Sequence, residues 1–148
     1  MINETLILRQ ASSYDIEMIS LWRNSPHARK YSFNTAEISW DNHQKWFRDT
    51  LQRKDRIIMI GELADTPIGV LRFELMKDEA EVSIYLDPNL YGKGLGTKLL
   101  QVGSEWLRAN LPHIKRMTAK ILQENIASKK AFLKAGFEEF YNIYHYDI

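Results

Sequence analysis

Apolar and polar residues follow two different periods along this chain, and each period predicts its own kind of element. Stretches rich in β-branched and apolar residues, bounded by turn-forming residues, predict strands. These strands are expected over 5–10, 56–63, 68–76, 79–86, 117–122 and 137–146. Apolar residues spaced three or four apart predict amphipathic helices over 13–24, 39–51, 94–110 and 125–135. The pattern therefore predicts a mixed fold of the α/β (α+β) class.

The order of the elements predicts how the strands pair. Short turns at Ala64–Pro67 and Lys77–Asp78 join three successive strands, as in an antiparallel meander. The helix over 94–110 separates the fourth strand from the fifth, and such a strand, helix, strand sequence requires a right-handed parallel crossover. Two helices are expected before the meander, with a break between them from Pro26 to Thr35.

Polar residues mark the ends of the expected helices, and apolar residues mark their buried faces. Ser13 and Ser39 are expected to cap the first two helices, and Gly136 is expected to end the last one in a left-handed conformation. The helix over 13–24 is expected to bury Ile16, Ile19 and Leu21. The helix over 39–51 is expected to bury Trp40, His43, Trp46, Phe47 and Leu51, and the helix over 94–110 to bury Leu95, Leu99, Val102 and Trp106.

Composition limits the classes of protein to consider. The 148 residues are expected to form one domain over 1–148, large enough to bury about 70% of its unfolded surface. A net charge of +1 argues against nucleic-acid binding driven by phosphate neutralisation. The absence of cysteine excludes disulfides, thiolate metal sites and a cysteine acyl-enzyme. No apolar stretch approaches the ~20 residues that span a bilayer and the N-terminus lacks a secretory pattern, so we expect a cytoplasmic protein without a membrane partner. The oligomeric state, a homodimer included, is left open.

A glycine-spaced loop carries the first functional signal. Between Asp87 and Thr97 the chain reads Asp-Pro-Asn-Leu-Tyr-Gly-Lys-Gly-Leu-Gly-Thr, and this loop connects a predicted strand to a predicted helix. Its glycines let backbone N–H groups turn inward without Cβ clashes, and the helix start adds unpaired donors with a partial positive charge. The loop therefore predicts a phosphate site, with pyrophosphate as the expected ligand.

Spacing separates this loop from other glycine-rich loops. A dinucleotide fingerprint that begins at Gly92 needs a further glycine where the chain has Thr97. A Walker loop needs a closing Gly-Lys-Ser/Thr string, which the chain lacks. On the loop alone, a glycine-rich turn without a ligand stays open.

A second motif follows after an intervening helix and strand. It reads Asn125-Ile-Ala-Ser-Lys-Lys-Ala-Phe-Leu-Lys-Ala-Gly-Phe137. Together the two segments resemble the GNAT superfamily of acetyl-coenzyme A-dependent N-acetyltransferases, over Glu79 to Phe137. In that family an Arg/Gln-x-x-Gly-x-Gly loop binds the coenzyme pyrophosphate, and Asn-x-x-Ser/Ala-(x)7-Gly-Phe follows it. Tyr91 departs from the Arg or Gln of the family, which removes one side-chain donor but no backbone donor.

The resemblance implies the GNAT fold and its co-substrate, acetyl-coenzyme A, with no metal. The sheet of that fold is mixed and mostly antiparallel, and its parallel fourth and fifth strands splay apart between flanking helices. The pantetheine arm is expected in this split, against the backbone of Ile84 and Leu86. Lys93 can meet the pyrophosphate, Thr97 can donate its hydroxyl, and Asn125 can hold the pantetheine or cap its helix. The implied coenzyme-binding set is Ile84, Leu86, Tyr91, Gly92, Lys93, Gly94, Leu95, Gly96, Thr97 and Asn125.

Alternation along the strand over 79–86 suggests where the catalytic groups lie. One face, expected under the helices, consists of Val82, Ile84 and Leu86. The other face, expected to line the cleft, consists of Glu81, Ser83 and Tyr85. An alkyl amine with a pKa of about 10.4 is neutral in about one molecule in 2,500 at pH 7, so a base assists its acetylation. Glu81 matches the position of this base in many GNAT enzymes, and a solvated strand carboxylate is the alternative. Ser83 is expected to assist a water relay, and a backbone N–H near Leu86 to polarise the thioester oxygen.

Two departures from the family pattern leave the proton donor open. Many relatives have a tyrosine as general acid seven residues after the motif asparagine, where this chain has Phe132. Many also have a glutamate five residues before that asparagine, where this chain has Lys120. Either the thiolate leaves unassisted, or Tyr85, Tyr91 or Tyr144 substitutes.

Acceptor specificity in this superfamily lies largely in the first two helices and their connection. Here a Trp-Arg-Asn string and a His-x-x-Trp-Phe string resemble acetyltransferases of nucleotide-linked 4-amino sugars, as in pseudaminic acid biosynthesis. Similar strings occur in ribosomal-protein N-terminal acetyltransferases. Arginine and lysine in this region can pair with a diphosphate, whereas a polycationic aminoglycoside or polyamine would favour an acidic cleft. The implied acceptor-binding residues are Trp22, Arg23, Asn24, His27 and His43. For the tryptophan and the two histidines, packing in the core is the alternative.

The sequence therefore predicts an N-acetyltransferase that moves an acetyl group from acetyl-coenzyme A directly to a small-molecule primary amine. The leading acceptor is the 4-amino group of a nucleotide-linked amino sugar. The alternatives are a protein N-terminal acetyltransferase, another small-amine acetyltransferase, and a catalytically weak module that senses acetyl-coenzyme A.

Overall fold

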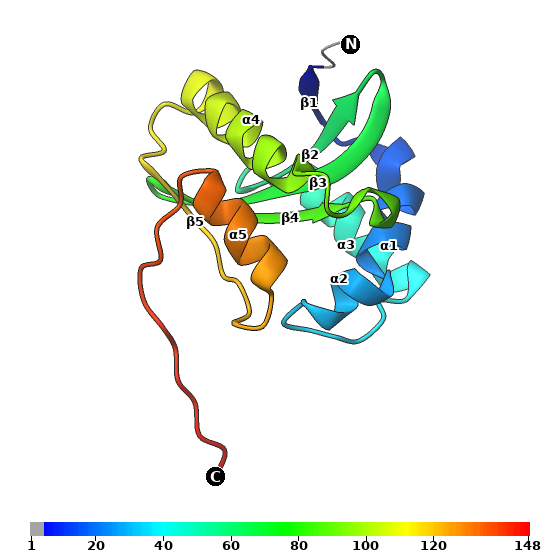
Figure 1. Ribbon diagram of the computed structural model, residues 1–148. Coiled ribbons are helices and arrows are strands. Elements are labelled where there is room, and N and C mark those ends of the chain that lie inside the picture. The colour runs from blue at the N-terminus through cyan, green and yellow to red at the C-terminus, as the bar shows by residue number, and fades with distance from the viewer. Residues whose placement is uncertain (1–4) are drawn as a thin grey trace.

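The structure, a computed structural model, describes residues 5–148. Its core is a five-stranded mixed sheet with helices on both faces (Figure 1). The strands are β1 (Leu6–Gln10), β2 (Arg56–Leu63), β3 (Thr66–Met76), β4 (Glu79–Leu86) and β5 (Arg116–Thr118). The helices are α1 (Ile16–Arg23), α2 (Pro26–Lys30), α3 (Trp40–Gln52), α4 (Leu95–Asn110) and α5 (Ile126–Lys134), with short 3-10 turns η1 (Ser13–Asp15) and η2 (Pro88–Leu90).

The strands lie in chain order, and the meander and the crossover that the sequence predicts are confirmed. Each of β1 to β4 pairs antiparallel with the next, and β5 pairs parallel with β4 after the return through α4. The turn between β2 and β3 is shorter than expected, because only Ala64 and Asp65 remain outside the strands, both with positive φ. This arrangement is the predicted mixed, mostly antiparallel sheet.

The sheet opens between β4 and β5, which positions the site. Their parallel pairing covers Glu79 to Glu81 opposite Arg116 to Thr118, so the rest of β4 has no strand beside it on this edge in the described part of the chain. The Asp87 N–H donates to the Ile68 carbonyl on β3 at 2.9 Å. Because successive N–H groups of an extended strand point to opposite edges, those of Ile84 and Leu86 point to the open edge.

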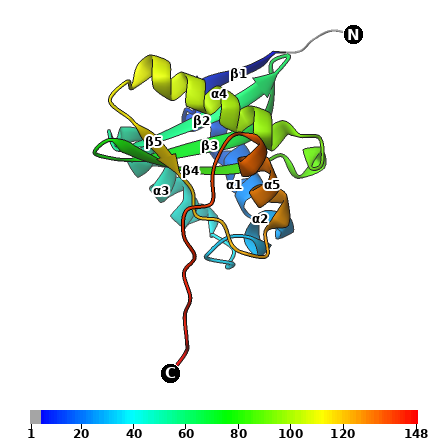
Figure 2. The same ribbon diagram turned by 60° about the vertical axis from the view of Figure 1, so that its left-hand side comes forward.

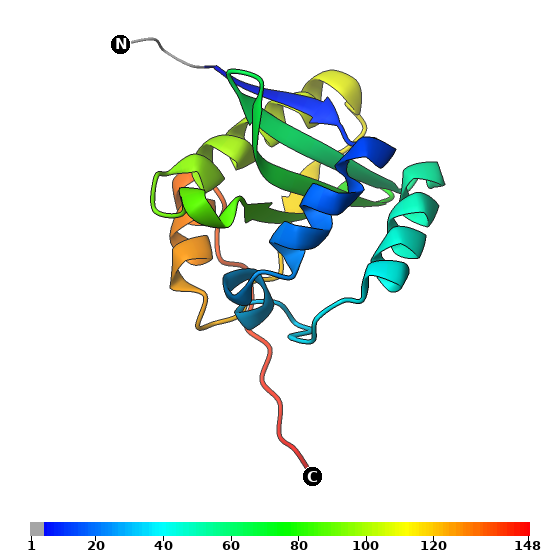
Figure 3. The ribbon, with the colours of Figure 1, turned by 90° about the vertical axis from the view of Figure 1, so that its right-hand side faces the viewer.

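Two hydrophobic cores fill the two faces of the sheet (Figures 2 and 3). On one face, α4 packs over the strands, with Leu99 and Leu100 fully buried against Leu71 and Phe73. On the other face, α1 and α3 pack over the strands. The residues buried there are Ile16, Ile19, Trp22, Phe47, Ile58, Ile60 and Val70. Val82, Ile84 and Leu86 belong to the α4 face, as the alternation of β4 predicts.

The first helical region differs from the prediction at three residues. Ser12 rather than Ser13 caps the first turn, with a backbone N–H to the Asp15 carboxylate at 2.8 Å. Leu21 is 72% exposed, although the spacing predicts it in the core. Pro26 begins α2 rather than ending helical structure, because the first helical position needs no N–H donor and Ser25 supplies the cap.

In helix α3 the predicted cap is confirmed, but fewer residues are buried than predicted. The Ser39 hydroxyl accepts from the Asn42 N–H at 3.2 Å. Trp40 and Leu51, near the two ends of the helix, are 45% and 38% exposed, whereas Phe47 is fully buried. The buried face of α3 consists of His43, Phe47 and Thr50, and it is narrower than the predicted face. On α4, Val102 and Trp106 are partly buried, alongside the buried Leu95 and Leu99.

The C-terminal strand predicted over 137–146 is wrong. Residues 137–148 contain no strand, and the segment runs away from the rest of the molecule (Figure 1). Phe140, Tyr144 and Tyr146 are more than four-fifths exposed. β5 covers Arg116–Thr118 instead of the predicted 117–122, so it offers few backbone groups to a further strand.

Two expectations concern a secretory signal and a membrane-spanning helix. Residues 1–4, where a secretory signal would begin, lie outside the described residues. From residue 5 onward, no helix combines the length and the apolar character needed to cross a bilayer.

Candidate active site

A cavity of about 860 Å³ lies where β4 parts from β5. One wall is formed by the loop before α4, by the first turn of α4 and by α5. The opposite wall is formed by α2, by the segment from Tyr31 to Ile38 and by α3. Residues Val82 to Leu86 of β4 lie between the two walls. Parts of the chain more than 100 residues apart therefore enclose one space.

The glycine loop presents unpaired backbone donors to this cavity. Gly92 and Gly94 have φ of +78° and +74°, and an added Cβ would meet no atom within 4 Å at either, so glycine is needed there for its backbone conformation and not for space. Gly94 is the N-cap of α4, and Lys98 is the first residue whose N–H bonds back into the helix, to the Gly94 carbonyl. The N–H groups before it have no partner within the helix, as at any helix start.

Most of the predicted coenzyme residues line the cavity. They are Ile84, Leu86, Tyr91, Gly92, Gly94, Leu95, Gly96, Thr97 and Asn125. Lys93 is exposed and does not line it. The Thr97 hydroxyl donates to the Ala131 carbonyl at 3.4 Å, which ties α4 to α5. Asn125 caps α5, because its side-chain oxygen accepts from the Ser128 N–H at 3.2 Å.

The predicted catalytic residues occupy different positions relative to the cavity. Ser83 and Tyr85 line it, whereas Glu81 does not. The Glu81 carboxylate lies 3.5 Å from the ammonium of Lys120, which lines the cavity. Burial raises the pKa of Tyr85, against the charges of Arg72 and Arg23, so its hydroxyl keeps its proton at neutral pH.

The predicted acceptor residues separate into two groups. Arg23, His27 and His43 line the cavity. Trp22 is 6% exposed and belongs to the core between the sheet and α1 and α3. Its position therefore fits core packing, the alternative to acceptor binding. The Asn24 amide exchanges two hydrogen bonds of 2.9 Å with the Ile38 backbone, which holds the wall segment in place.

The two histidines of the cavity are held by different neighbours. His43 is 2% exposed, and its buried Nε2 has no hydrogen-bond partner among the described residues. Burial lowers the pKa of His43, a backbone hydrogen bond with Ile16 raises it, and the charge of Arg23 lowers it. His27 contacts Tyr31 edge-on and Tyr91 at a tilt, with ring centroids 5.0 and 4.2 Å away. Burial also lowers the pKa of His27.

The comparisons with known proteins identify the family. The model of the acetyltransferase (GNAT) domain family matches residues 5–138. The chain belongs to the GNAT family. It is 30% identical over 138 residues to an uncharacterised protein of Methanocaldococcus jannaschii, a match that covers 90% of this chain and 28% of that protein. It is 30% identical over 112 residues to L-methionine sulfoximine/L-methionine sulfone acetyltransferase of Pseudomonas aeruginosa, covering 72% of this chain and 64% of that enzyme. The chain thus spans less than two thirds of either relative.

A solved GNAT structure shows the same fold. The aminoglycoside acetyltransferase AAC(6')-Ib, in complex with acetyl-coenzyme A and paromomycin, superposes with a TM-score of 0.81 at 23% identity, covering 90% of this chain and 83% of that one. The superfamily and the fold that the motifs predict are therefore confirmed. The sugar-nucleotide and ribosomal branches stay predictions.

Both departures from the GNAT pattern lie at this cavity. Phe132 is 5% exposed, lines the cavity and packs edge-on against Phe137 with ring centroids 4.8 Å apart. Of the three tyrosines considered as proton donors, Tyr85 and Tyr91 line the cavity. Tyr144 lies in the exposed C-terminal segment, 89% exposed, so the structure does not bring it to the site.

Sequence reasoning did not single out Arg72, which lines the cavity of this GNAT domain. Arg72 lies on β3, in register with Ser83 on β4, and its Nη2 donates to the Ser83 hydroxyl at 3.4 Å. Its guanidinium carbon lies 5.5 Å from the centroid of the Trp46 ring, and both residues line the cavity. Alternation within β3 would have placed Arg72 on the same face as Ser83, had the register been known.

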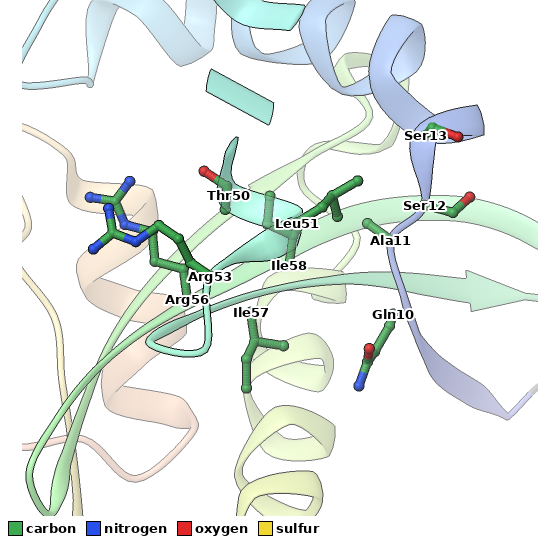
Figure 4. A pocket seen from close by; sticks show the side chains of 10 residues that line it. All are labelled: Gln10, Ala11, Ser12, Ser13, Thr50, Leu51, Arg53, Arg56, Ile57 and Ile58. Atoms are coloured by element: carbon green, nitrogen blue, oxygen red, sulfur yellow. The ribbon is translucent and has the colours of Figure 1, made fainter. Parts of the chain in front are cut away.

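A second cavity, of about 390 Å³, lies away from the GNAT motifs (Figure 4). It lies between the end of β1, the end of α3 and the start of β2, and its lining includes the backbone after Gln10 and the side chains of Arg53 and Arg56. Thr50 contributes a buried hydroxyl without a hydrogen-bond partner among the described residues. Over residues 5–148 no cluster of three or more His, Asp or Glu residues could hold a metal ion.

Proposed function

We propose that this chain transfers the acetyl group of acetyl-coenzyme A directly to a primary amine. One observation supports this most: a single cavity holds the unpaired N–H groups at the start of α4 and the free N–H groups of Ile84 and Leu86. The first set suits a diphosphate, and the second suits an amide-containing arm that adds to the edge of β4. Acetyl-coenzyme A combines both features and supplies an activated acyl group.

The residues around the open edge suit the steps of acetyl transfer. The Leu86 N–H points to this edge, where it can donate to the thioester oxygen as negative charge develops there. Glu81 is the proposed base, acting through water, because its carboxylate lies next to the cavity-lining Lys120. Ser83 lines the space between Glu81 and Tyr85 and can hold such a water. Tyr85 is protonated at neutral pH and can donate a proton to the leaving thiolate.

The amine of a nucleotide-linked amino sugar is the proposed acceptor. Two arginines, Arg23 on α1 and Arg72 on β3, line the same cavity as the glycine loop, where they can pair with phosphates. The Trp46 and Tyr31 rings also line this cavity and can pack against a sugar or a base. An amino acid is the second candidate, because the Pseudomonas relative is named for acting on methionine derivatives.

Release of free thiol from acetyl-coenzyme A tests the transfer. The protein is incubated with acetyl-coenzyme A and, in turn, with amino-sugar nucleotides, amino acids, peptides, polyamines and aminoglycosides. We expect acceptor-dependent release with one class and, by mass spectrometry, an acceptor heavier by one acetyl group. Coenzyme binding by calorimetry without release for any acceptor would overturn the proposal and favour a sensor of acetyl-coenzyme A.

A further inference from the structure

The charged residues that line the main cavity all carry the same sign. They are Arg23, Arg72, Lys120, Lys130 and Lys134, and no Asp or Glu within residues 5–148 lines it. Lys130 and Lys134 lie on α5, which packs against α4, so a coenzyme with several phosphates accounts for them. Lys120 pairs with Glu81. The two arginines lie on other elements, α1 and β3, so the coenzyme phosphates next to α5 do not account for them.

Arg72 is held in place by contacts on several sides. Its Nη2 donates to the Ser83 hydroxyl and lies 3.6 Å from the Glu74 carboxylate, which also pairs with Arg56 at 3.6 Å. Its guanidinium carbon lies over the Trp46 ring. Its Nε is buried and has no hydrogen-bond partner among residues 5–148. Arg72 thus has a defined orientation and a donor to spare.

Arg23 has less compensation for its charge. Its Nη2 donates to the Asn34 carbonyl at 3.1 Å, and its buried Nη1 has no partner within residues 5–148. No carboxylate of the described chain forms an ion pair with it. Burial lowers the pKa of Arg23, and the charges of Arg72 and Arg29 lower it further, whereas Tyr85 raises it. A half-buried cation beside other cations is destabilised unless an anion joins it.

We propose that Arg23 and Arg72 together bind an anionic group of the acceptor, a phosphate or a carboxylate that lies close to its reactive amine. This inference rests on the proposed function and names the class of its acceptor. Guanidinium groups suit such anions, because they donate two parallel hydrogen bonds to one phosphate or carboxylate. The same two charges repel polycationic amines such as polyamines and aminoglycosides.

Paired acceptors that differ only in the anion test the specificity. An amino sugar 1-phosphate is compared with the free amino sugar, and an amino acid with its amide. We expect kcat/KM to be about 10- to 100-fold higher for the anionic member of the productive pair, as for one charged hydrogen-bonded group. The productive pair distinguishes a phosphate from a carboxylate. Equal kcat/KM within each pair, or the highest kcat/KM with a polyamine, would overturn the inference.

Substitutions assign the effect to the two arginines. Arg23→Met and Arg72→Met keep much of the aliphatic stem and remove the charge. Each is expected to raise KM for the anionic acceptor about 10- to 100-fold and to leave KM for its neutral partner unchanged. Arg48→Met, on the exposed side of α3, is the matched control and should change neither. Thermal unfolding and coenzyme affinity verify that the variants fold, and Arg23→Gln and Arg72→Gln, which also remove the charge, replace any variant that does not.

A binding measurement separates failure of this inference from failure of the proposed function. The protein is saturated with coenzyme A and titrated by calorimetry with uridine diphosphate or N-acetylglutamate, which carry the anion without a reactive amine. Binding that either arginine variant abolishes supports the anion site, even if no amine releases thiol. Absence of binding to both probes, together with acetyl transfer to neutral amines, overturns the anion site and leaves the proposed function in place.

Discussion

The ammonium of Lys120 lies 3.5 Å from the carboxylate of Glu81, the residue expected to act as the base. Lys120 occupies the position where many GNAT enzymes have a glutamate. In this chain a cation therefore lies between the expected base and the cavity, since Lys120 lines the cavity and Glu81 does not.

Glu81→Gln is expected to lower kcat by about 100-fold or more, because it removes a general base from the reaction. Affinity for the coenzyme should change little, since Glu81 lies off the cavity lining. The measurement is kcat as a function of pH, in which the acidic limb should disappear. Glu79→Gln, on the same strand and paired with Arg116 at 3.8 Å, is the control. An unchanged pH profile for Glu81→Gln would reject Glu81 as the base.

Tyr85→Phe is expected to lower kcat by about tenfold or more, because the leaving thiolate then lacks its proton donor. Burial raises the pKa of Tyr85, so the loss should be the same from pH 6 to 9. Tyr91→Phe is the matched comparison, since Tyr91 also lines the cavity but packs on His27. Single-turnover rates for both variants identify the donor. If neither rate falls, the thiolate leaves unassisted.

Gly94→Ala is expected to weaken coenzyme binding, because a non-glycine residue at φ +74° strains the loop by about 1–2 kcal/mol. Gly136→Ala provides a control with similar strain, at φ +103°, at the end of α5 and outside the cavity lining. Both variants should lower the free energy of unfolding, measured by urea titration. Only Gly94→Ala should raise the Kd for coenzyme A in calorimetry. A Kd that rises equally in both variants would contradict the role of the loop.

The stability of the protein is expected to fall as the pH drops below about 6.5, the ordinary pKa of histidine. Burial lowers the pKa of His43 in the folded protein, so below that pH the unfolded chain binds a proton that the folded chain does not. The slope for one such group approaches about 1.4 kcal/mol per pH unit until the folded pKa is reached.

Urea titrations from pH 5 to 8 measure this effect. His43→Gln should flatten the decline, and a smaller slope should remain because burial also lowers the pKa of His27. His113→Gln, at an exposed position, is the control. A slope that His43→Gln leaves unchanged would contradict the assignment to His43.

The parts of the fold that the sequence predicts well depend on short-range signals. The bounds of β2 and β4 follow from turn residues on either side, and Gly94 and Asn125 mark helix starts through backbone and capping chemistry. Predictions that depend on long-range contacts succeeded less often. Leu21 has the spacing of a core residue but faces solvent.

The site shows the same division. The glycine loop could be located from the chain alone, because it consists of consecutive residues that line the cavity together. Arg72 could not be located, because its place beside Ser83 follows from the register of β3 against β4. The location of Glu81 beside Lys120 likewise depends on where β5 ends relative to β4.

The order of the strands from β1 to β5, the position of the glycine loop and the membership of an acetyltransferase family were determined by the sequence itself, because each rests on neighbouring residues and their local conformations. Only the tertiary structure decided that Trp22 lies in the core, that Lys120 pairs with Glu81, and that the charged residues lining the cavity are all cations. The physical reason is that charge and burial at one point in space depend on residues from distant parts of the chain, brought together by strand register and helix packing.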